Sequence, residues 1–130
     1  PDSLVQIVDR LRGVIVEDRP ALDVIRRYDT VDTLFYVDPP YVHSTRGDDS
    51  RYRLEMSDDE HREMASVVRQ VRGKVIISGY PCDLYDAELF SDWQRIDAST
   101  HADGGRVRIE ALWLSPNTLQ PQMQLLTEVN

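Results

Sequence analysis

The sequence predicts an α/β domain in which parallel strands carry helices on both faces and the last two strands form an antiparallel pair. Three observations predict this fold. Short apolar runs alternate with stretches of helical periodicity along most of the chain. The runs are rich in β-branched residues, as buried strands are. The final two runs have no helical pattern between them, which favours direct antiparallel pairing.

The first predicted element is a helix that follows Ser3 and ends at Gly13, a residue typical of helix ends. Its apolar residues recur at the i, i+3, i+4, i+7 spacing of one helix face: Leu4, Ile7, Val8 and Leu11. The β-branched run 14–16 comes next. It predicts a short buried strand.

The next two elements are a helix and a strand that ends abruptly. Asp18 and Pro20 resemble the cap and the first turn of a helix that runs to Tyr28. The apolar run 34–37 then predicts a second strand. Two prolines follow Asp38 and stop it.

The second half of the chain begins with a capping box, because Ser57 is followed by Glu60. We expect this helix to run to about Arg72, with its inward face formed by Met64, Val67, Val68 and Val71. The run 74–77 predicts the next buried strand, which ends at 78–79.

The C-terminal part is predicted to contain a short helix at 83–90, a strand near 93–96 and a strand at 107–114. The last strand alternates, with one side formed by Val107, Ile109, Ala111 and Trp113. We expect both tryptophans, Trp93 and Trp113, to lie in the core.

Length and composition bound the interpretation. The chain has 130 residues, one cysteine and a formal net charge of −8, with a pI near 4.7. This length fits a single domain over 1–130. No apolar run reaches the roughly 18 residues of a membrane span, and no leader pattern is present, so we expect a cytoplasmic protein without membrane contact. The acidic charge argues against a free-standing nucleic-acid binder.

Ligands of open parallel sheets bind beyond the carboxyl ends of the strands. Three such ends carry polar or aromatic residues: Glu17-Asp18, Asp38-Pro39-Pro40-Tyr41 and Ser78-Gly79-Tyr80. The second is the sharpest signal in the chain, because a buried strand leads directly into an acid, two prolines and an aromatic ring.

The four residues that begin at Asp38 are suited to hold a planar amine. The prolines stiffen the turn, and Pro40 keeps Pro39 extended, so that the Pro39 carbonyl points into the cleft. Carboxylate and carbonyl are two acceptors for one exocyclic amino group, and Tyr41 offers a flat face for a ring. Such a pair orients the nitrogen lone pair toward an electrophile without a metal. The alternative is a purely structural turn.

The remaining candidates favour structural explanations. The three histidines, His43, His61 and His101, share no ligand spacing, so we expect surface or loop positions and no metal. Cys82 is predicted to be a buried structural thiol. An acidic group at a helix start is explained by the helix dipole: Asp58, Asp59, Glu60 and Glu63.

The stretch from Asp32 to Tyr41 resembles motif IV of the Dam-type (D12 class) DNA adenine-N6 methyltransferases. The stretches 10–18 and 21–29 resemble the approach to that motif in phage-type members, and 52–56, 57–62, 73–80 and 103–116 follow in the family's order. The similarity covers nearly the whole chain.

The resemblance implies methyl transfer from S-adenosylmethionine to N6 of an adenine flipped out of double-stranded DNA. Asp38 and the Pro39 carbonyl would hold the amine, with Tyr41 stacked on the ring. The base pocket would include Pro40, Ser78 and Tyr80, and Glu17-Asp18 would approach the cofactor. Arg53 and Tyr52 belong to a basic cluster with Arg46 and Arg51. This cluster could contact DNA or clamp the base, or could be an ordinary loop.

The chain departs from the family in one respect. The glycine-rich S-adenosylmethionine loop and the DNA-recognition region, which lie upstream of motif IV in the family, have no counterpart here. We therefore expect 1–130 to be a partial methyltransferase domain, the C-terminal portion of a Rossmann-like sheet, inactive as an isolated chain. A second chain could supply the N-terminal half. The alternative is a non-catalytic remnant or a partner-binding half-domain.

Overall fold

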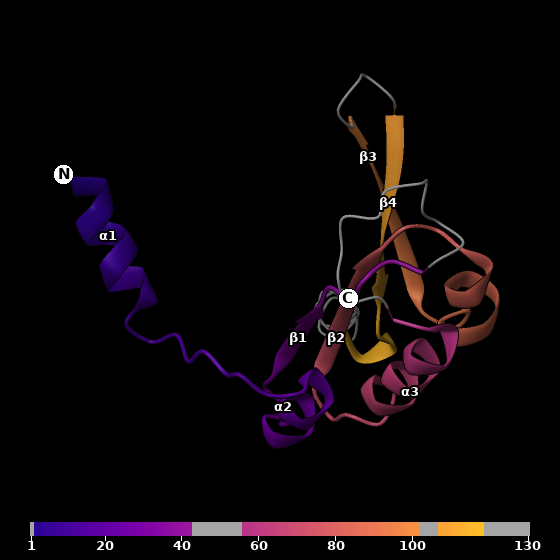
Figure 1. Ribbon diagram of the computed structural model, residues 1–130, viewed down its shortest axis with the longest axis horizontal. Helices are drawn as coiled ribbons and strands as arrows, with labels where there is room; N and C mark the ends of the chain where they lie inside the picture. Colours follow the sequence, from indigo (N-terminus) through magenta and orange to yellow (C-terminus); the bar gives the residue numbers. More distant parts are fainter. Residues whose placement is uncertain (1, 43–55, 102–106, 119–130) are drawn as a thin grey trace, which may run out of the picture.

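The computed structural model describes residues 2–42, 56–101 and 107–118 (Figure 1). Four strands and several helices follow the alternating order of the sequence pattern. In chain order they are α1 (Asp2–Leu11), α2 (Ala21–Arg27), β1 (Leu34–Val37), α3 (Asp58–Val68), β2 (Lys74–Gly79), the π-helix η2 (Leu84–Leu89), β3 (Gln94–His101), β4 (Val107–Leu114) and the 3-10 turn η3 (Pro116–Thr118). None of the described helices is long and apolar enough to cross a membrane.

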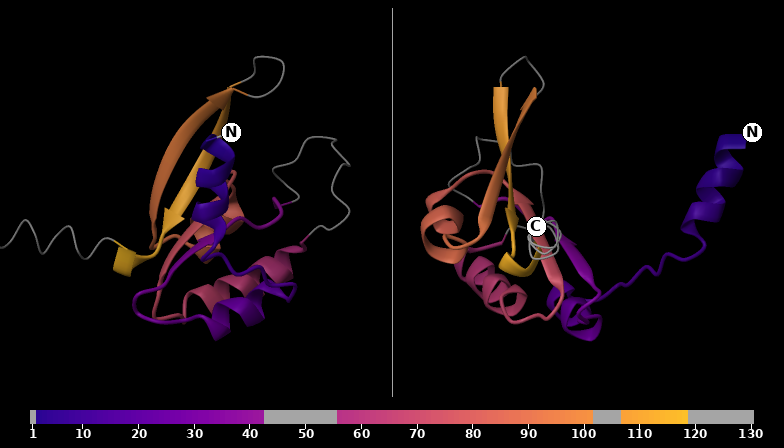
Figure 2. Two further views of the ribbon diagram at one scale, coloured as in Figure 1. Left: turned by 90° about the vertical axis from the view of Figure 1, so that its left-hand side faces the viewer. Right: turned by 180° about the vertical axis from the view of Figure 1, so that it is seen from behind.

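The four strands form one mixed sheet in the order β1-β2-β4-β3. β1 and β2 are parallel, with Val37 opposite Ile77, and β3 and β4 are antiparallel. Both pairings confirm the sequence-based expectation. The order adds a feature that was not predicted, because β4 inserts between β2 and β3 and runs antiparallel to β2 as well. The β3–β4 pair projects beyond the helices (Figures 1 and 2).

The core lies on one face of this sheet, where α2, α3 and η2 pack. Val75 and Ile77 of β2 are fully buried, and Trp113 of β4 is 1% exposed. Trp93 joins them, so both tryptophans are core residues as predicted. The other face differs from the prediction. Among the described residues no helix covers it, and Tyr36 is 63% exposed.

The helix α1 forms where predicted but buries none of its apolar side chains. It stands apart from the sheet (Figures 1 and 2), and its apolar residues are more than half exposed: Leu4, Val5, Ile7, Val8 and Leu11. Periodicity shows that a helix has an apolar face, but not what that face packs against. We expected helices on both faces of the sheet because strands and helices alternate along the chain. In the described part only one face is covered, because α1 does not pack on the sheet.

The predicted strand at 14–16 is wrong. These residues belong to an irregular segment, and exposure rises to 90% at Val16. A strand needs a neighbouring backbone to pair with. Within the described residues the sheet ladder includes no partner for this run.

The helix boundaries show which local signals operate. α2 begins at Ala21 after Pro20, without a side-chain cap, so the expected cap by Asp18 is wrong. The capping box of α3 is confirmed, because Ser57 N donates to Glu60 Oε2 at 2.7 Å and Glu60 N donates to Ser57 Oγ at 3.3 Å. α3 ends at Val68 rather than at Arg72.

Candidate active site

The parallel pairing of β1 and β2 brings two of the predicted strand ends together. Val37 lies opposite Ile77 as the last pair of the β1–β2 ladder. Asp38 and Ser78 follow these residues at the same edge of the sheet. Ser78 Oγ donates a hydrogen bond to Asp38 Oδ1 at 2.8 Å. The carboxylate at the end of β1 is therefore hydrogen-bonded to the hydroxyl near the end of β2.

The aromatic residues of the same two segments also meet. The rings of Tyr41 and Tyr80 are stacked, with centroids 4.3 Å apart and planes inclined by 27°. Burial, followed by the hydrogen bond and charge of Tyr80 and the charge of Asp38, raises the pKa of Tyr41 to about 12. The Tyr41 hydroxyl thus stays protonated near neutral pH. Its ring is presented as a neutral stacked surface.

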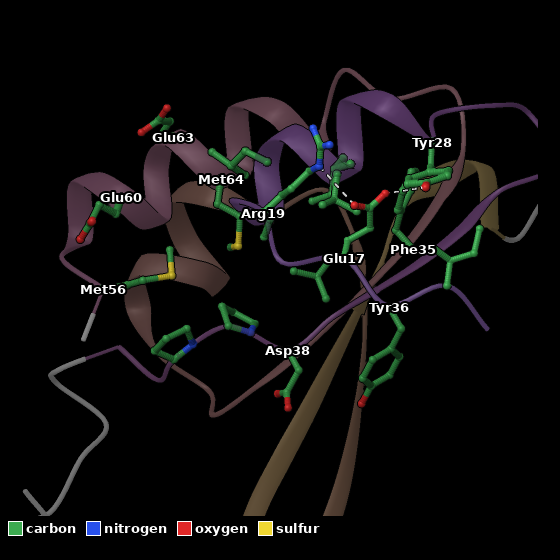
Figure 3. A pocket seen from close by; sticks show the side chains of 18 of the residues that line it. Glu17, Arg19, Tyr28, Phe35, Tyr36, Asp38, Met56, Glu60, Glu63 and Met64 are labelled. Carbon is green, nitrogen blue, oxygen red and sulfur yellow. Dashed lines mark hydrogen bonds and ion pairs between the residues drawn. The ribbon is translucent and has the colours of Figure 1, made fainter. Parts of the chain in front are cut away.

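A cavity of about 920 Å³ opens beside β1 (Figure 3). Asp38, Pro39 and Pro40 line it together with Glu17. The segment Glu17-Asp18 was predicted to follow a strand at 14–16. That strand does not form, yet Glu17 lines the same cavity as Asp38. Asp18 is exposed and is not part of the wall, so the structure does not bring it to the other predicted residues.

Glu17 is held in place by two neighbours. The Tyr28 hydroxyl donates to Glu17 Oε1 at 2.7 Å, and Arg19 Nε lies 3.2 Å from Glu17 Oε2; both contacts are drawn in Figure 3. The hydrogen bond to Glu17 is the main cause that raises the pKa of Tyr28. A carboxylate offers about four acceptor positions, so these contacts leave Glu17 able to accept further hydrogen bonds.

The wall of the cavity combines carboxylates with apolar side chains. Glu60 and Glu63 stand on α3, across the cavity from Asp38 (Figure 3). The apolar lining includes Ile15, Leu22, Phe35, Met56 and Met64. This chemistry suits a ligand that has both a positive charge and an extended apolar or aromatic part.

Several predicted residues are not part of this site. Tyr52 and Arg53, with Arg46 and Arg51, lie outside the described residues, as does His43. The acidic start of α3 is engaged in capping and in an ion pair of Asp59 with Arg62 at 2.9 Å. Within the described residues no group of three or more acidic, histidine or cysteine side chains is placed to hold a metal ion.

Two features of the site region were missed or misjudged from the sequence. Arg19 and Tyr28 orient Glu17 through contacts that no local pattern announces. His61 was expected at the surface, yet it is fully buried, and its Nδ1 lies 2.9 Å from the Tyr85 hydroxyl. A signal for this existed, because His61 is spaced as one helix face with Met64, Ala65 and Val68.

Comparison with known proteins gives one result and one negative finding. No curated protein sequence matches the chain. Residues 2–104 match the family described as D12 class N6 adenine-specific DNA methyltransferase. That match covers more than three quarters of the chain and includes both strand ends described above. The chain therefore belongs to the D12 class N6 adenine-specific DNA methyltransferase family.

Proposed function

We propose that this chain carries the catalytic motif of an S-adenosylmethionine-dependent DNA adenine-N6 methyltransferase, in a Rossmann-like sheet of which these four strands are part. The observation that carries the proposal is the position of Asp38-Pro39-Pro40 at the end of β1, in the wall of a large cavity, in a chain of this family. The family acts on adenine in DNA. The residues at the cavity support a specific mechanism for methyl transfer to this base.

The exocyclic amine of adenine is a weak nucleophile because its lone pair is delocalised into the ring. The Asp38 carboxylate and the Pro39 carbonyl can each accept one of its two N–H hydrogens. Two acceptors on one side draw the nitrogen toward tetrahedral geometry and turn its lone pair to the opposite side. The contribution is orientation and electrostatic preorganisation; once the methyl group is attached, one of the two N–H protons would be released from the nitrogen and the other would stay hydrogen-bonded.

A base inside a duplex cannot reach this motif, so the proposal includes a flipped-out adenine. Tyr41 supplies the stacking surface that an unpaired base requires. One face of Tyr41 is already covered by Tyr80 at 4.3 Å. The base would therefore stack on the opposite face, as the third ring of one column.

The residues of the cavity fit S-adenosylmethionine. When bound, this cofactor supplies an electrophilic methyl group on a positively charged sulfur. Glu17 and Asp38 offer carboxylates for a cationic ligand, and Phe35 and Met56 offer apolar surface for its adenosyl part. Glu17 would hold the cofactor, with Arg19 and Tyr28 fixing its orientation.

The test of this function is the substitution Asp38→Ala in the active preparation, by which we mean the enzyme with all the polypeptide that methyl transfer requires. The assay measures transfer of a labelled methyl group to adenine in duplex DNA. We expect a loss of at least about 100-fold in kcat, as for other removed transition-state contacts. Asp38 is exposed, so the circular dichroism spectrum and the unfolding temperature should be retained.

Asp32→Ala is the matched control, because Asp32 is an exposed aspartate just before β1, at its opposite end. It should retain methyl transfer. If Asp38→Ala retains activity, the catalytic assignment fails. If it loses its fold instead, the structural-turn interpretation is correct.

A second proposal concerns completeness. The apolar side chains of α1 and of 14–16 are more than half exposed, which is unusual for a monomeric surface. We propose that further polypeptide, in the same protein or in a second chain, covers them and completes the cofactor site. Calorimetry with S-adenosylmethionine tests this proposal. The chain alone should bind the cofactor at least about tenfold more weakly than the active preparation, and equal affinity would contradict it.

A further inference from the structure

The carboxylate of Asp38 is held from the neighbouring strand, and we propose that Ser78 is the residue that sets its orientation for the reaction. This inference rests on the proposed function of Asp38. It assigns Ser78 a positioning role, which differs from the direct contact with the base implied by the family resemblance.

The hydrogen bond is the first step of the argument. Ser78 Oγ lies 2.8 Å from Asp38 Oδ1 and 3.4 Å from the carbonyl oxygen of Val37. A serine hydroxyl has one hydrogen to donate. It goes to the shorter contact, in which the acceptor is charged and the bond is stronger. Ser78 is therefore a donor to the carboxylate.

Asp38 needs such a partner because its side chain is exposed. Packing does not fix the rotation of its carboxylate, and the last torsion of an aspartate is broad. A hydrogen bond to Oδ1 stops this rotation. It leaves Oδ2 in a defined place as the acceptor for the substrate amine.

Ser78 itself is placed by the core. The residues that precede it along β2 alternate between half-buried and buried, and Val75 and Ile77 are fully buried. Their pairing with Phe35 and Val37 fixes the register of the two strands. The hydroxyl is thus mounted on a rigid element that cannot slide relative to the motif, as a preorganised site requires.

The expected kinetic signature follows from this arrangement. The single hydrogen of Ser78 is committed to Asp38, so the hydroxyl has none to donate to the base. Its removal should leave DNA binding nearly unchanged and reduce the fraction of complexes in which Oδ2 meets the amine. A change in kcat with a constant KM distinguishes positioning from direct substrate contact.

The experiment compares Ser78→Ala and Ser78→Thr with wild type in the active preparation, with kcat and KM measured on duplex DNA. We expect Ser78→Ala to lower kcat by about 10- to 100-fold, up to the loss that a misplacement of about 1 Å can cause, with KM within about twofold. Ser78→Thr keeps a hydroxyl and should recover most of the rate. A crystal structure of Ser78→Ala should show the Asp38 carboxylate rotated from its wild-type orientation.

Ser115→Ala is the matched control. Ser115 also makes a hydrogen bond at β2, where it is buried and its Oγ accepts from Val75 N at 2.9 Å, but it lies at the far end of the strand. This variant should lower the unfolding temperature and leave kcat of the folded enzyme unchanged. A fall in kcat for Ser78→Ala at equal or higher stability than Ser115→Ala then reports positioning.

Three results would overturn the inference: a raised KM with unchanged kcat, unchanged kinetics altogether, or a folded Ser78→Thr no faster than Ser78→Ala. Each can be told apart from failure of the proposed function. That function requires an active wild type and an inactive Asp38→Ala, whatever the Ser78 variants do.

Discussion

At the residue scale, side chains at the end of β2 hold side chains at the end of β1, and Tyr80 and Tyr41 are one such pair. Their rings are stacked at 4.3 Å, and Ser78 bonds Asp38 from the same segment. The last residues of β2 and the tyrosine that follows them thus support both the acid and the ring of the motif after β1. This stack leaves only the opposite face of the Tyr41 ring for the base stacking that we propose.

The raised pKa of Tyr41 makes stability depend on pH in the alkaline range. Its pKa is about 12 in the folded chain, against the ordinary tyrosine value of 10.0. The unfolded chain therefore loses this proton first as the pH rises. Below about pH 10 Tyr41 is protonated in both states, so its titration should not change the free energy of unfolding. Between about pH 10 and 12 we expect the free energy of unfolding to fall. Urea unfolding across this range measures the slope.

Tyr41→Phe removes the ionisable group and keeps the stacked ring. It should reduce the alkaline slope without abolishing it, because burial also raises the pKa of Tyr85. An alkaline slope equal to that of wild type would show that Tyr41 does not carry this effect.

At the scale of elements, the two parallel strands are aligned by the turns that precede them. The Asp29 carboxylate, between α2 and β1, accepts hydrogen bonds from the backbone N–H groups of Arg72 at 2.9 Å and Gly73 at 2.9 Å. Lys74 N donates to the carbonyl of Thr33 at 2.8 Å. A Cβ at Gly73 would lie 2.8 Å from that same carbonyl oxygen. These contacts fix where β1 and β2 start, and hence where Asp38 and Ser78 meet.

Asp29→Ala should lower the free energy of unfolding by about 1–3 kcal/mol, because it leaves backbone donors without their acceptor. The backbone N–H of Arg72 is the main cause that lowers the pKa of Asp29 in the folded chain. Its stabilisation is therefore present above the unfolded pKa of about 4 and lost as the pH falls through the lower folded pKa. The variant should show a weaker acid dependence than wild type in urea titrations.

Asp23→Ala is the control for this element. Asp23 is 63% exposed and pairs only at the surface of α2 with Arg26, at 3.3 Å, so its loss should change stability by less than about 1 kcal/mol. Equal losses from Asp23→Ala and Asp29→Ala would argue against a special role of the Asp29 turn.

At the scale of the whole molecule, the net charge and the exposed apolar surface both favour an active enzyme that contains further polypeptide. The net charge is −8, and α1 presents an uncovered apolar face. A surface of this charge does not attract the DNA backbone. If the proposed function is correct, the active enzyme would gain its DNA contacts from polypeptide beyond the described sheet.

We expect the chain alone to bind a labelled duplex with a Kd above about 100 μM at physiological salt, in or beyond the range typical of non-specific complexes. Fluorescence anisotropy measures this directly. The active preparation, tested on the same duplex, is the positive control. Submicromolar, salt-sensitive binding by the chain alone would contradict the expectation.

Much of the fold could be predicted because its signals are local. The capping box at Ser57 and the apolar run 34–37 gave elements that the structure confirms. The run 14–16 gave a wrong prediction, since β-branched residues show that a strand is possible but not that a partner strand is present. His61 shows the opposite error, because a polar residue was not weighed as part of a buried helix face.

The sequence by itself determined the helices and strands of the sheet, the parallel and antiparallel pairs, and the acid, prolines and tyrosine at the end of β1. These depend on periodicity, turn chemistry and order along the chain, which neighbouring residues encode. Only the tertiary structure decided that β4 lies between β2 and β3, that within the described residues no helix covers the second sheet face or the apolar side of α1, and that Ser78 hydrogen-bonds to Asp38 while Tyr80 stacks on Tyr41. Contacts between residues some 40 positions apart depend on strand register and on the packing of a common core, and neither is written in any single segment.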